Sequence, residues 1–325
     1  MSAGMEAIVN RKHNYRLSIK KIWNQLGMLI VLVGISIILA IFAPNFTDTG
    51  NILNILKQSS VNGILAAGMT LVILTGGIDL SVGSTIALAG VVSVLLSKQG
   101  VNPIIAMFAG IAVGYLAGWI NGFLTARTKL PSFIVTLGSM TYIRGAAYVI
   151  SGGLPTILAS EPFKFIGSGK ILAVPTPIYI MLTVYIVMFI VLKYTMFGRH
   201  IYAIGGNEEA ARLTGIKVEK TLIHVYAISG LCAGLAGVVL AGRLISGQPN
   251  AGNMAELDAI ASVVLGGTSL VGGIGRIQMT IIGVLILGVI RNGLTLLNVS
   301  FFWQTVITGI VIVLAVLLDR LRSEK

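Results

Sequence analysis

Charged side chains are scarce in this sequence, at 10% of 325 residues, whereas hydrophobic residues make up 55%. A soluble domain carries about 25% charged residues. Together with a mean hydropathy of +0.93, this scarcity excludes a soluble globule and indicates a polytopic membrane protein. Acidic residues are the scarcer sign, which leaves a net charge of +12. The basic residues lie in short segments between apolar runs, the positive-inside pattern of membrane proteins, so we expect no nucleic-acid partner.

Cysteine and the common catalytic motifs are also lacking. The one cysteine, Cys232, can form no disulfide within the chain and no thiolate metal cluster. The GSGK run at 167–170 resembles part of a Walker A motif, but it is followed by Ile171 and lacks the upstream glycine. No zinc motif, Ser/His/Asp array or nucleophile elbow is visible. We therefore expect no metal and no cofactor on this chain, and no enzyme activity of its own.

Apolar runs of about 20 residues are long enough to cross a bilayer as helices. The sequence predicts an all-α polytopic membrane protein with about ten transmembrane helices, of which the segments 80–97 and 258–272 are short and bounded by glycine. The ten expected spans are 25–43, 52–75, 80–97, 103–125, 131–150, 177–193, 222–243, 258–272, 277–296 and 301–318.

The basic residues orient these spans. With the N-terminus inside, most lysines and arginines fall in cytoplasmic segments, so both termini are predicted to be cytoplasmic. The expected organisation is a cytoplasmic segment 1–24, a transmembrane domain 25–318 and a cytoplasmic tail 319–325. Two long connections, an external loop 151–176 and a cytoplasmic loop 194–221, are the candidates for functional loops.

Asp79 is a nearly isolated acid between two apolar runs, next to Gly76 and Gly77. A carboxylate at membrane depth costs roughly 2.5–3.5 kcal/mol on insertion scales, so it needs a partner, a cavity or a function. The glycines predict a broken helix, which transporters use to build binding sites. We favour Asp79 as a cap for the helix that starts near Leu80. The expected solute pathway is lined by Gly76, Gly77, Asp79, Ser81, Ser84, Asn62 and Asn121.

A weak internal repeat supports a second break. GGIDLSVG at 76–83 aligns with GGTSLVGG at 266–273, with both leading glycines in register. Corresponding glycine-interrupted segments in two halves of a chain indicate a transporter's binding region.

Residues 205–215, GGNEEAARLTG, predict a short helix outside the membrane. Asn207 is the expected N-cap, Glu208 and Glu209 would lie in the first turn where the helix dipole favours them, and Gly215 would end the helix. A solvated connector is the plain alternative, but a compact capped helix between two spans favours a docking element for a cytoplasmic partner.

Glu209-Ala210-Ala211 followed by Gly215 resembles the opening of the EAA loop, by which permeases of ATP-binding-cassette importers dock their ATPase. The later Ile-x-Leu-Pro of that pattern is absent. Three stretches extend the resemblance over nearly the whole chain and are similar to the ribose-type sugar permease family: GMTLVILTGGIDLSVGS (68–84), GRHIYAIGGNEEAARLTGI (198–216) and ELDAIASVVLGGTSLVGGIGRI (256–277).

This resemblance implies the permease subunit of an importer for a monosaccharide in the bacterial inner membrane. Ribose is the expected solute, and other pentoses, hexoses or autoinducer-2 stay open. The implied partners are a second permease copy, a cytoplasmic ATPase that holds ATP and Mg²⁺, and an extracytoplasmic sugar-binding protein. Membrane lipid would surround the spans. The docking residues would be Asn207, Glu208, Glu209, Ala210, Ala211 and Gly215, and a face for the binding protein would include Arg243, Glu256 and Asp258 as an ion-pair cluster.

The rival hypothesis is a stand-alone secondary transporter or channel for a small polar solute, with Asp79 as a proton or cation site. Such proteins usually carry a pair or relay of intramembrane acids. Asp79 is nearly alone, which argues against this alternative.

Overall fold

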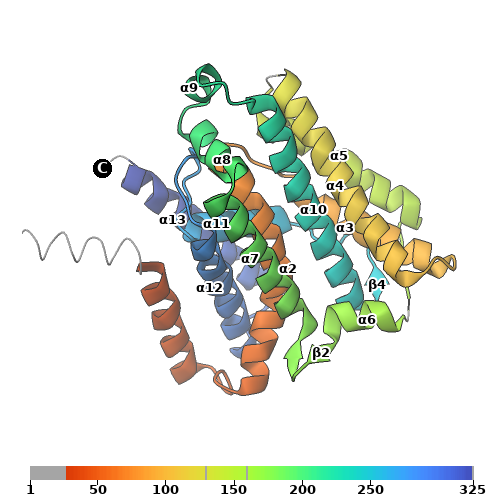
Figure 1. Ribbon diagram of the computed structural model, residues 1–325. Helices are drawn as coiled ribbons and strands as arrows, with labels where there is room; N and C mark the ends of the chain where they lie inside the picture. The colour runs from red at the N-terminus through yellow and green to blue at the C-terminus, as the bar shows by residue number, and fades with distance from the viewer. Residues whose placement is uncertain (1–26, 129, 159, 324–325) are drawn as a thin grey trace, which may run out of the picture.

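The computed structural model describes residues 27–128, 130–158 and 160–323, and this part of the chain is almost entirely helical (Figure 1). A first helix covers Gly27–Phe42. The helices that follow are α2 (Thr49–Leu74), α3 (Val82–Lys98), α4 (Pro103–Thr128), α5 (Ser132–Ser151), α6 (Glu161–Ser168), α7 (Thr176–Tyr194), α8 (Met196–Gly206), α9 (Glu208–Leu213), α10 (Val218–Leu244), α11 (Ala255–Leu265), α12 (Ile277–Leu296) and α13 (Phe301–Ser323). In the described ranges, short antiparallel pairs join β1 (Thr156–Ile157) to β4 (Ser246–Gly247) and β2 (Lys170–Ile171) to β3 (Val174–Pro175).

Each of the ten expected spans overlaps a helix. Within the described residues five helices are long and apolar enough to cross a membrane: α4, α5, α7, α10 and α12. The expected span 258–272 is wrong in its second half. Helix α11 ends at Leu265, and residues 266–276 are not helical. The expected cytoplasmic segment 1–24 lies outside the described residues, and helix α13 continues through Ser323 into the expected tail.

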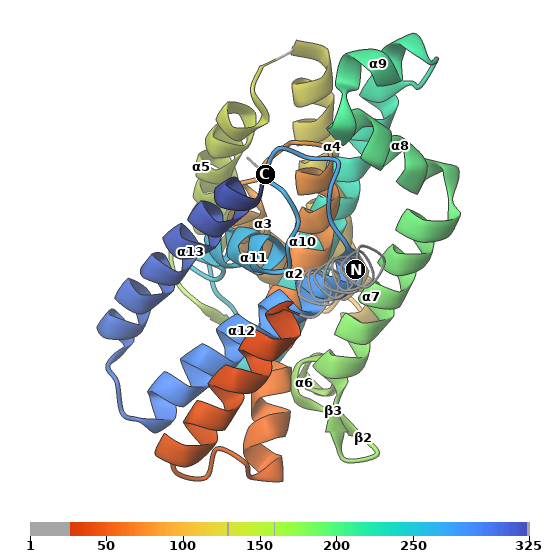
Figure 2. The ribbon, with the colours of Figure 1, turned by 90° about the vertical axis from the view of Figure 1, so that its left-hand side faces the viewer.

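The two long connections, predicted as loops, contain helices and short strands. Residues 194–221 hold helices α8 and α9, and residues 151–176 hold α6 with three of the short strands. Because α9 and α6 lie at opposite ends of the molecule (Figures 1 and 2), we refer below to the α9 end and the α6 end. At the α9 end, Arg127 and Arg212 form ion pairs with Glu219. At the α6 end, the backbone of Arg243 lies beside α6.

Helix α10 is the centre of the bundle. It packs against α2, α3 and α4, and most of its length is buried. Helix α5 is mostly exposed and packs against α3 and, to a smaller extent, α4. Helix α10 occupies the place expected of a helix that is apolar on all sides, the core of the bundle, where its neighbours cover it.

Helices α4 and α10 approach closely because glycines face each other. Gly114 and Gly118 of α4 lie against Gly230 of α10, and a Cβ atom placed on Gly118 would overlap the carbonyl oxygen of Tyr226 and lie 2.9 Å from Gly230 Cα. Small residues at such crossings let the backbones pack directly against each other, which favours helix association in lipid.

Substituting Gly118→Ala should therefore destabilise the bundle by about 1–3 kcal/mol, the usual cost of overpacking. The measurement is the midpoint of thermal unfolding of the full chain in detergent micelles. Gly138→Ala on α5 is the matched control, since nothing lies within 4 Å of the Cβ position there. A midpoint for Gly118→Ala equal to that of the control would contradict the packing described here.

Candidate functional site

The first break in the helices lies between α2 and α3, over residues 75–81. Helix α2 ends because Gly76 adopts a φ of +79°, a left-handed conformation that favours glycine. The amide of Gly76 then donates to Ile73 O at 2.9 Å and that of Gly77 to Val72 O at 3.1 Å, the pattern of a Schellman C-cap. The broken helix predicted from the paired glycines is confirmed.

The backbone of the break is held by α5. Ile78 N donates to Ser132 Oγ at 3.0 Å, and Thr136 Oγ1 donates to Ile78 O at 3.2 Å. Irregular backbone at membrane depth requires partners of this kind, because lipid offers none. Helix α5 is thus tied to the break at its first two turns.

Asp79 is fully buried and accepts three hydrogen bonds. Its Oδ1 receives the Ser81 amide at 3.0 Å and Ser81 Oγ at 2.6 Å, and its Oδ2 receives Ser229 Oγ of α10 at 3.2 Å. Asp79 thus binds the first turn of α3, as expected of a cap, although the helix starts at Val82 and Ser81 is the formal N-cap residue.

The hydrogen bonds continue from Ser81 across the bundle. Asn121 Nδ2 of α4 donates to Ser81 Oγ at 2.8 Å, and Ser139 Oγ of α5 donates to Asn121 Oδ1. A buried network of side chains therefore joins the break, α3, α4, α5 and α10. Satisfied buried networks of this kind rigidify a core.

The residues expected to line a pathway fall into three groups. Asp79, Ser81, Ser84 and Asn121 are buried in helix contacts, and Ser84 Oγ donates to Ser81 O at 2.9 Å. Gly76 and Gly77 line a cavity described below. The half-buried Asn62 lies apart from both groups and donates to Ser262 Oγ of α11 at 3.0 Å. In this conformation the two glycines are the members of the expected pathway that line the cavity.

The second break follows α11. Gly267 has a φ of +81° and donates to Val264 O, as Gly76 does to Ile73 O at the first break. The geometry therefore pairs Gly76 with Gly267, whereas the sequence alignment pairs it with Gly266. The repeated break is present, and the alignment is one residue out of register.

The two breaks meet each other and helix α8. Gly273 N donates to Leu74 O at 2.9 Å, and a Cβ placed on Gly205 of α8 would overlap Leu74 O and Gly273 N. Tyr202 Oη, one turn earlier on α8, donates to Gly275 O at 3.0 Å. We call the contact of Leu74, Gly205 and Gly273 the glycine junction.

Helix α9 has the predicted caps. Asn207 Oδ1 accepts the Ala210 amide at 2.9 Å, and Gly215, with a φ of +86°, follows the helix end. Its buried Ala211 packs in a small apolar cluster with Ile204 and Val218, so α9 is anchored to its own chain more firmly than the sequence indicates. Glu208, Glu209 and Ala210 remain exposed.

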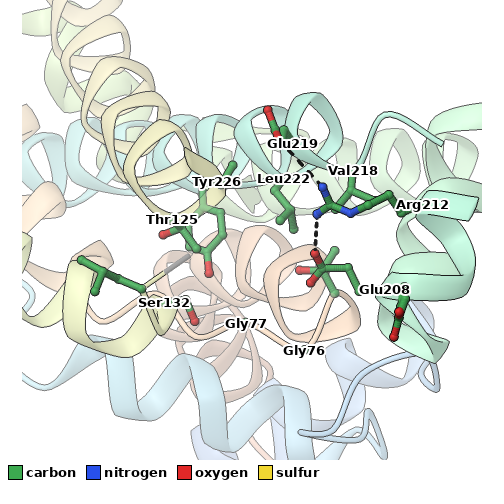
Figure 3. Close-up of a pocket in the computed structure, with 14 residues that line it drawn as sticks. Gly76, Gly77, Thr125, Ser132, Glu208, Arg212, Val218, Glu219, Leu222 and Tyr226 are labelled. Atoms are coloured by element: carbon green, nitrogen blue, oxygen red, sulfur yellow. Dashed lines mark hydrogen bonds and ion pairs between the residues drawn. The ribbon is translucent and has the colours of Figure 1, made fainter. Parts of the chain in front are cut away.

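A cavity of about 620 Å³ opens at the α9 end, between the first break and helix α9 (Figure 3). It lies between the break, the ends of α4 and α5, helix α9 and the start of α10. Its lining residues are Thr75, Gly76, Gly77, Thr125, Ala126, Leu130, Ser132, Glu208, Glu209, Arg212, Val218, Glu219, Leu222 and Tyr226.

Ion pairs join the elements around this cavity. Arg212 of α9 lies 3.0 Å from Glu208 and 4.0 Å from Glu219 of α10, and Glu219 lies 3.5 Å from Arg127 of α4. Since all four side chains are exposed, each pair contributes little energy alone, about 0–1 kcal/mol. Together they connect α9 to the ends of two long helices.

The expected cluster of Arg243, Glu256 and Asp258 is not formed. Asp258 pairs with Arg291 of α12 at 2.6 Å, and Glu256 interacts with Arg144 of α5. Among the described residues Arg243 forms no ion pair. The expectation is wrong because α10 ends beside α6, so that the Arg243 backbone lies against α6.

Sequence reasoning missed Tyr226, Thr125, Ser132 and Gly205 at this site. Tyr226 lies in an apolar span and reads as a core residue. A usable signal exists for Gly205, since it precedes the capped helix as one of two adjacent glycines. The other three come from three different helices, which only the fold brings together.

Comparison with known proteins gives consistent results. A family model described as "Branched-chain amino acid transport system / permease component" matches residues 51–316. The chain is 46% identical over 310 residues to the ribose import permease protein RbsC of Bacillus subtilis strain 168, covering 95% of this chain and 96% of that one. It is 48% identical over 295 residues to RbsC of Escherichia coli K12, covering 90% and 92%.

The chain is also similar to a permease that is named for a different sugar. The L-arabinose transport system permease protein AraH of Escherichia coli K12 is 41% identical over 307 residues, covering 94% of each chain. No solved structure matches this chain.

Proposed function

The chain belongs to the permease family whose model is described as a branched-chain amino acid transport system permease component. From this membership and the similarity to ribose and L-arabinose permeases, we propose that it forms the translocation path for ribose or a related monosaccharide. It is a multi-pass permease subunit of a bacterial ATP-binding-cassette importer in the inner membrane, a transport component rather than an enzyme. The observation that carries the choice of solute is the identity of 41–48% to permeases named for ribose and L-arabinose.

The α9 end is the proposed cytoplasmic end, where an ATPase subunit with ATP and Mg²⁺ would dock. Helix α9 supports this role because it presents exposed acids and Leu213, whose side chain is 83% exposed. The glycine junction would then transmit movement of α8 and α9 to both breaks.

Alternating access would follow from that connection. Closure of the ATPase subunits would move α8 and α9, shift the two breaks against each other and open the bundle toward the α6 end. A sugar-binding protein would deliver solute there, with Glu256, Asp258 and Arg243 on the receiving side. A second permease copy and lipid would cover the exposed apolar faces of α4 and α5.

Reversing one charge on the docking helix tests the ATPase partner. Glu209→Lys should weaken ATPase binding about tenfold or more, because close charge pairs across an interface carry that much coupling. The measurement is co-purification of the ATPase with the permease from detergent-solubilised membranes, with permease abundance in the membrane as the reference.

Glu161→Lys, an equal reversal on α6 at the other end, is the control, and it removes only an exposed pair with Lys164. Equal ATPase recovery from both variants would show that α9 is not the docking element.

The transport function itself is tested in proteoliposomes. Ribose uptake should require this chain, the ATPase with ATP, and the binding protein together. Uptake by this chain alone, driven by a proton gradient, would replace the proposal with the secondary-transporter alternative.

A further inference from the structure

A non-helical segment between α10 and α11 enters the bundle along α3. We call its residues 246–254 the strap. Gly247 lies against Val91 of α3, and Gly252 lies against Gly83, since a Cβ on either glycine would crowd the α3 backbone there. An α-helix rises about 1.5 Å per residue, so the strap descends about 12 Å along α3 from the α6 end toward the first break. Helix α11, which follows the strap, lies at mid-height between the two ends (Figure 2).

The strap is held by a charged residue of α5. Arg144 Nη1 donates to Pro249 O at 2.9 Å and to Ala251 O at 2.6 Å. Glu256, nearly buried in the first turn of α11, interacts with the same guanidinium group. Charged side chains at membrane depth are usually paired with each other or with backbone carbonyls. The charges beside the strap are therefore already engaged within the protein.

Two residues of the strap have polar groups without a protein partner. Asn250 and Asn253 are exposed, and within the described ranges neither their side chains nor their backbone amides form a hydrogen bond. Irregular backbone at membrane depth is tolerated only where protein covers it or where it lines a water-filled space, because lipid offers no hydrogen bonds. The exposed side of the strap therefore needs water.

We propose that the strap lines the water-filled path of the solute, where the amide side chains of Asn250 and Asn253 bond to the hydroxyl groups of a monosaccharide. The inference rests on the proposed function and adds the contact residues for the solute. A carboxamide both donates and accepts hydrogen bonds, as a sugar hydroxyl does. The strap is not part of the cavity at the α9 end. Its exposed side is open in the single chain, so a second permease copy shields it from lipid.

The chemistry of the strap favours a sugar over the branched-chain amino acids named in the family description. A zwitterion that leaves bulk water needs a partner for its ammonium group and another for its carboxylate. The charged neighbours of the strap, Arg144 and Glu256, are engaged with the strap carbonyls and with each other. The groups of Asn250 and Asn253 that remain available are neutral, and a polyol needs no others.

The test first measures whether water reaches the strap. Asn250→Cys or Asn253→Cys is introduced into the full chain in nanodiscs, which leave both faces of the bilayer open, and a charged methanethiosulfonate reagent is added. The native Cys232 is fully buried and gives little background. Leu172, at the tip of the β2–β3 pair, is 91% exposed. Both strap thiols should react within about tenfold of the rate of Leu172→Cys, since a thiol in water ionises readily.

Ile186→Cys is the matched control within the bilayer. Ile186 is 59% exposed on α7, which lies on the opposite side of the bundle from α5 (Figure 2). Its thiol should react at least about a hundredfold more slowly than the strap thiols, because apolar surroundings keep a thiol protonated. If the strap thiols react as slowly as this control, the strap does not meet water and the inference is overturned.

Protection by ribose tests the contact with the solute. At a ribose concentration about twice the dissociation constant, the reaction of both strap thiols should slow about threefold. Ribose should leave Leu172→Cys unaffected, and leucine should protect neither strap thiol. Adding Asn250→Ala to Asn253→Cys should raise the ribose concentration for half protection about two- to tenfold, the effect of losing one hydrogen bond. Folding should be kept, because the Asn250 side chain has no partner among the described residues.

The proposed function is measured in parallel through ATP-dependent ribose uptake by the unsubstituted permease with its partners. If uptake occurs while ribose protects neither strap thiol, the solute contacts inferred here are overturned and the proposed function stands. Protection by leucine but not ribose would overturn the sugar assignment. Failure of uptake would overturn the proposed function, and the assignment of ribose to the strap with it.

Discussion

Gly205→Ala should abolish most sugar uptake while leaving the ATPase bound. The added methyl group would overlap Leu74 O and Gly273 N at the glycine junction, where these two atoms form a hydrogen bond that joins the two breaks. Overpacking costs about 1–3 kcal/mol. Because about 1.4 kcal/mol corresponds to a tenfold change, we expect uptake to fall about tenfold or more. The measurement is ATP-dependent ribose uptake in proteoliposomes.

Gly206→Ala is the matched control for this experiment. The neighbouring glycine lies on the same helix, and nothing lies within 4 Å of its Cβ position, so uptake should stay near that of the unsubstituted chain. If both variants transport equally well, the junction does not carry movement from α8 to the breaks. Loss of the ATPase from Gly205→Ala would place the defect in docking instead.

Asp79→Ala should strongly destabilise the protein. Removing the carboxylate leaves the Ser81 amide, Ser81 Oγ and Ser229 Oγ without their acceptor. Each buried donor without a partner costs about 1–3 kcal/mol. We expect little folded protein in the membrane and a markedly lower thermal midpoint in detergent. An unchanged midpoint would show that Asp79 does not hold the break.

Asp79→Asn separates this structural role from an ionic one. The amide oxygen can still accept from Ser81, and its NH₂ group can donate to Ser229 Oγ, so folding and ATP-dependent uptake should largely survive. A proton or cation site would lose its charge and its coupling. Full loss of uptake with normal folding in Asp79→Asn would therefore favour the secondary-transporter alternative.

Local chemistry made the helices and their caps predictable. Each of the ten apolar runs overlaps a helix within the described residues because a chain in lipid must satisfy its backbone hydrogen bonds internally. Asn207 and Gly215 bound α9 as expected, since a cap depends on residues a few positions away. The span 258–272 failed because a glycine-rich segment can continue as helix or turn, and hydropathy does not distinguish the two.

The sequence by itself determined the membrane class, the helix positions, the broken helix at Gly76 and the α9 docking candidate, which follow from hydropathy, charge and neighbours along the chain. Only the tertiary structure decided which residues meet. Ser229 reaches Asp79 across 150 positions, and Arg291 pairs with Asp258 across 33. Tyr226 lines the cavity because α10 packs beside the first break. Such contacts depend on how whole helices pack, and packing leaves no local pattern in the residues that it brings together.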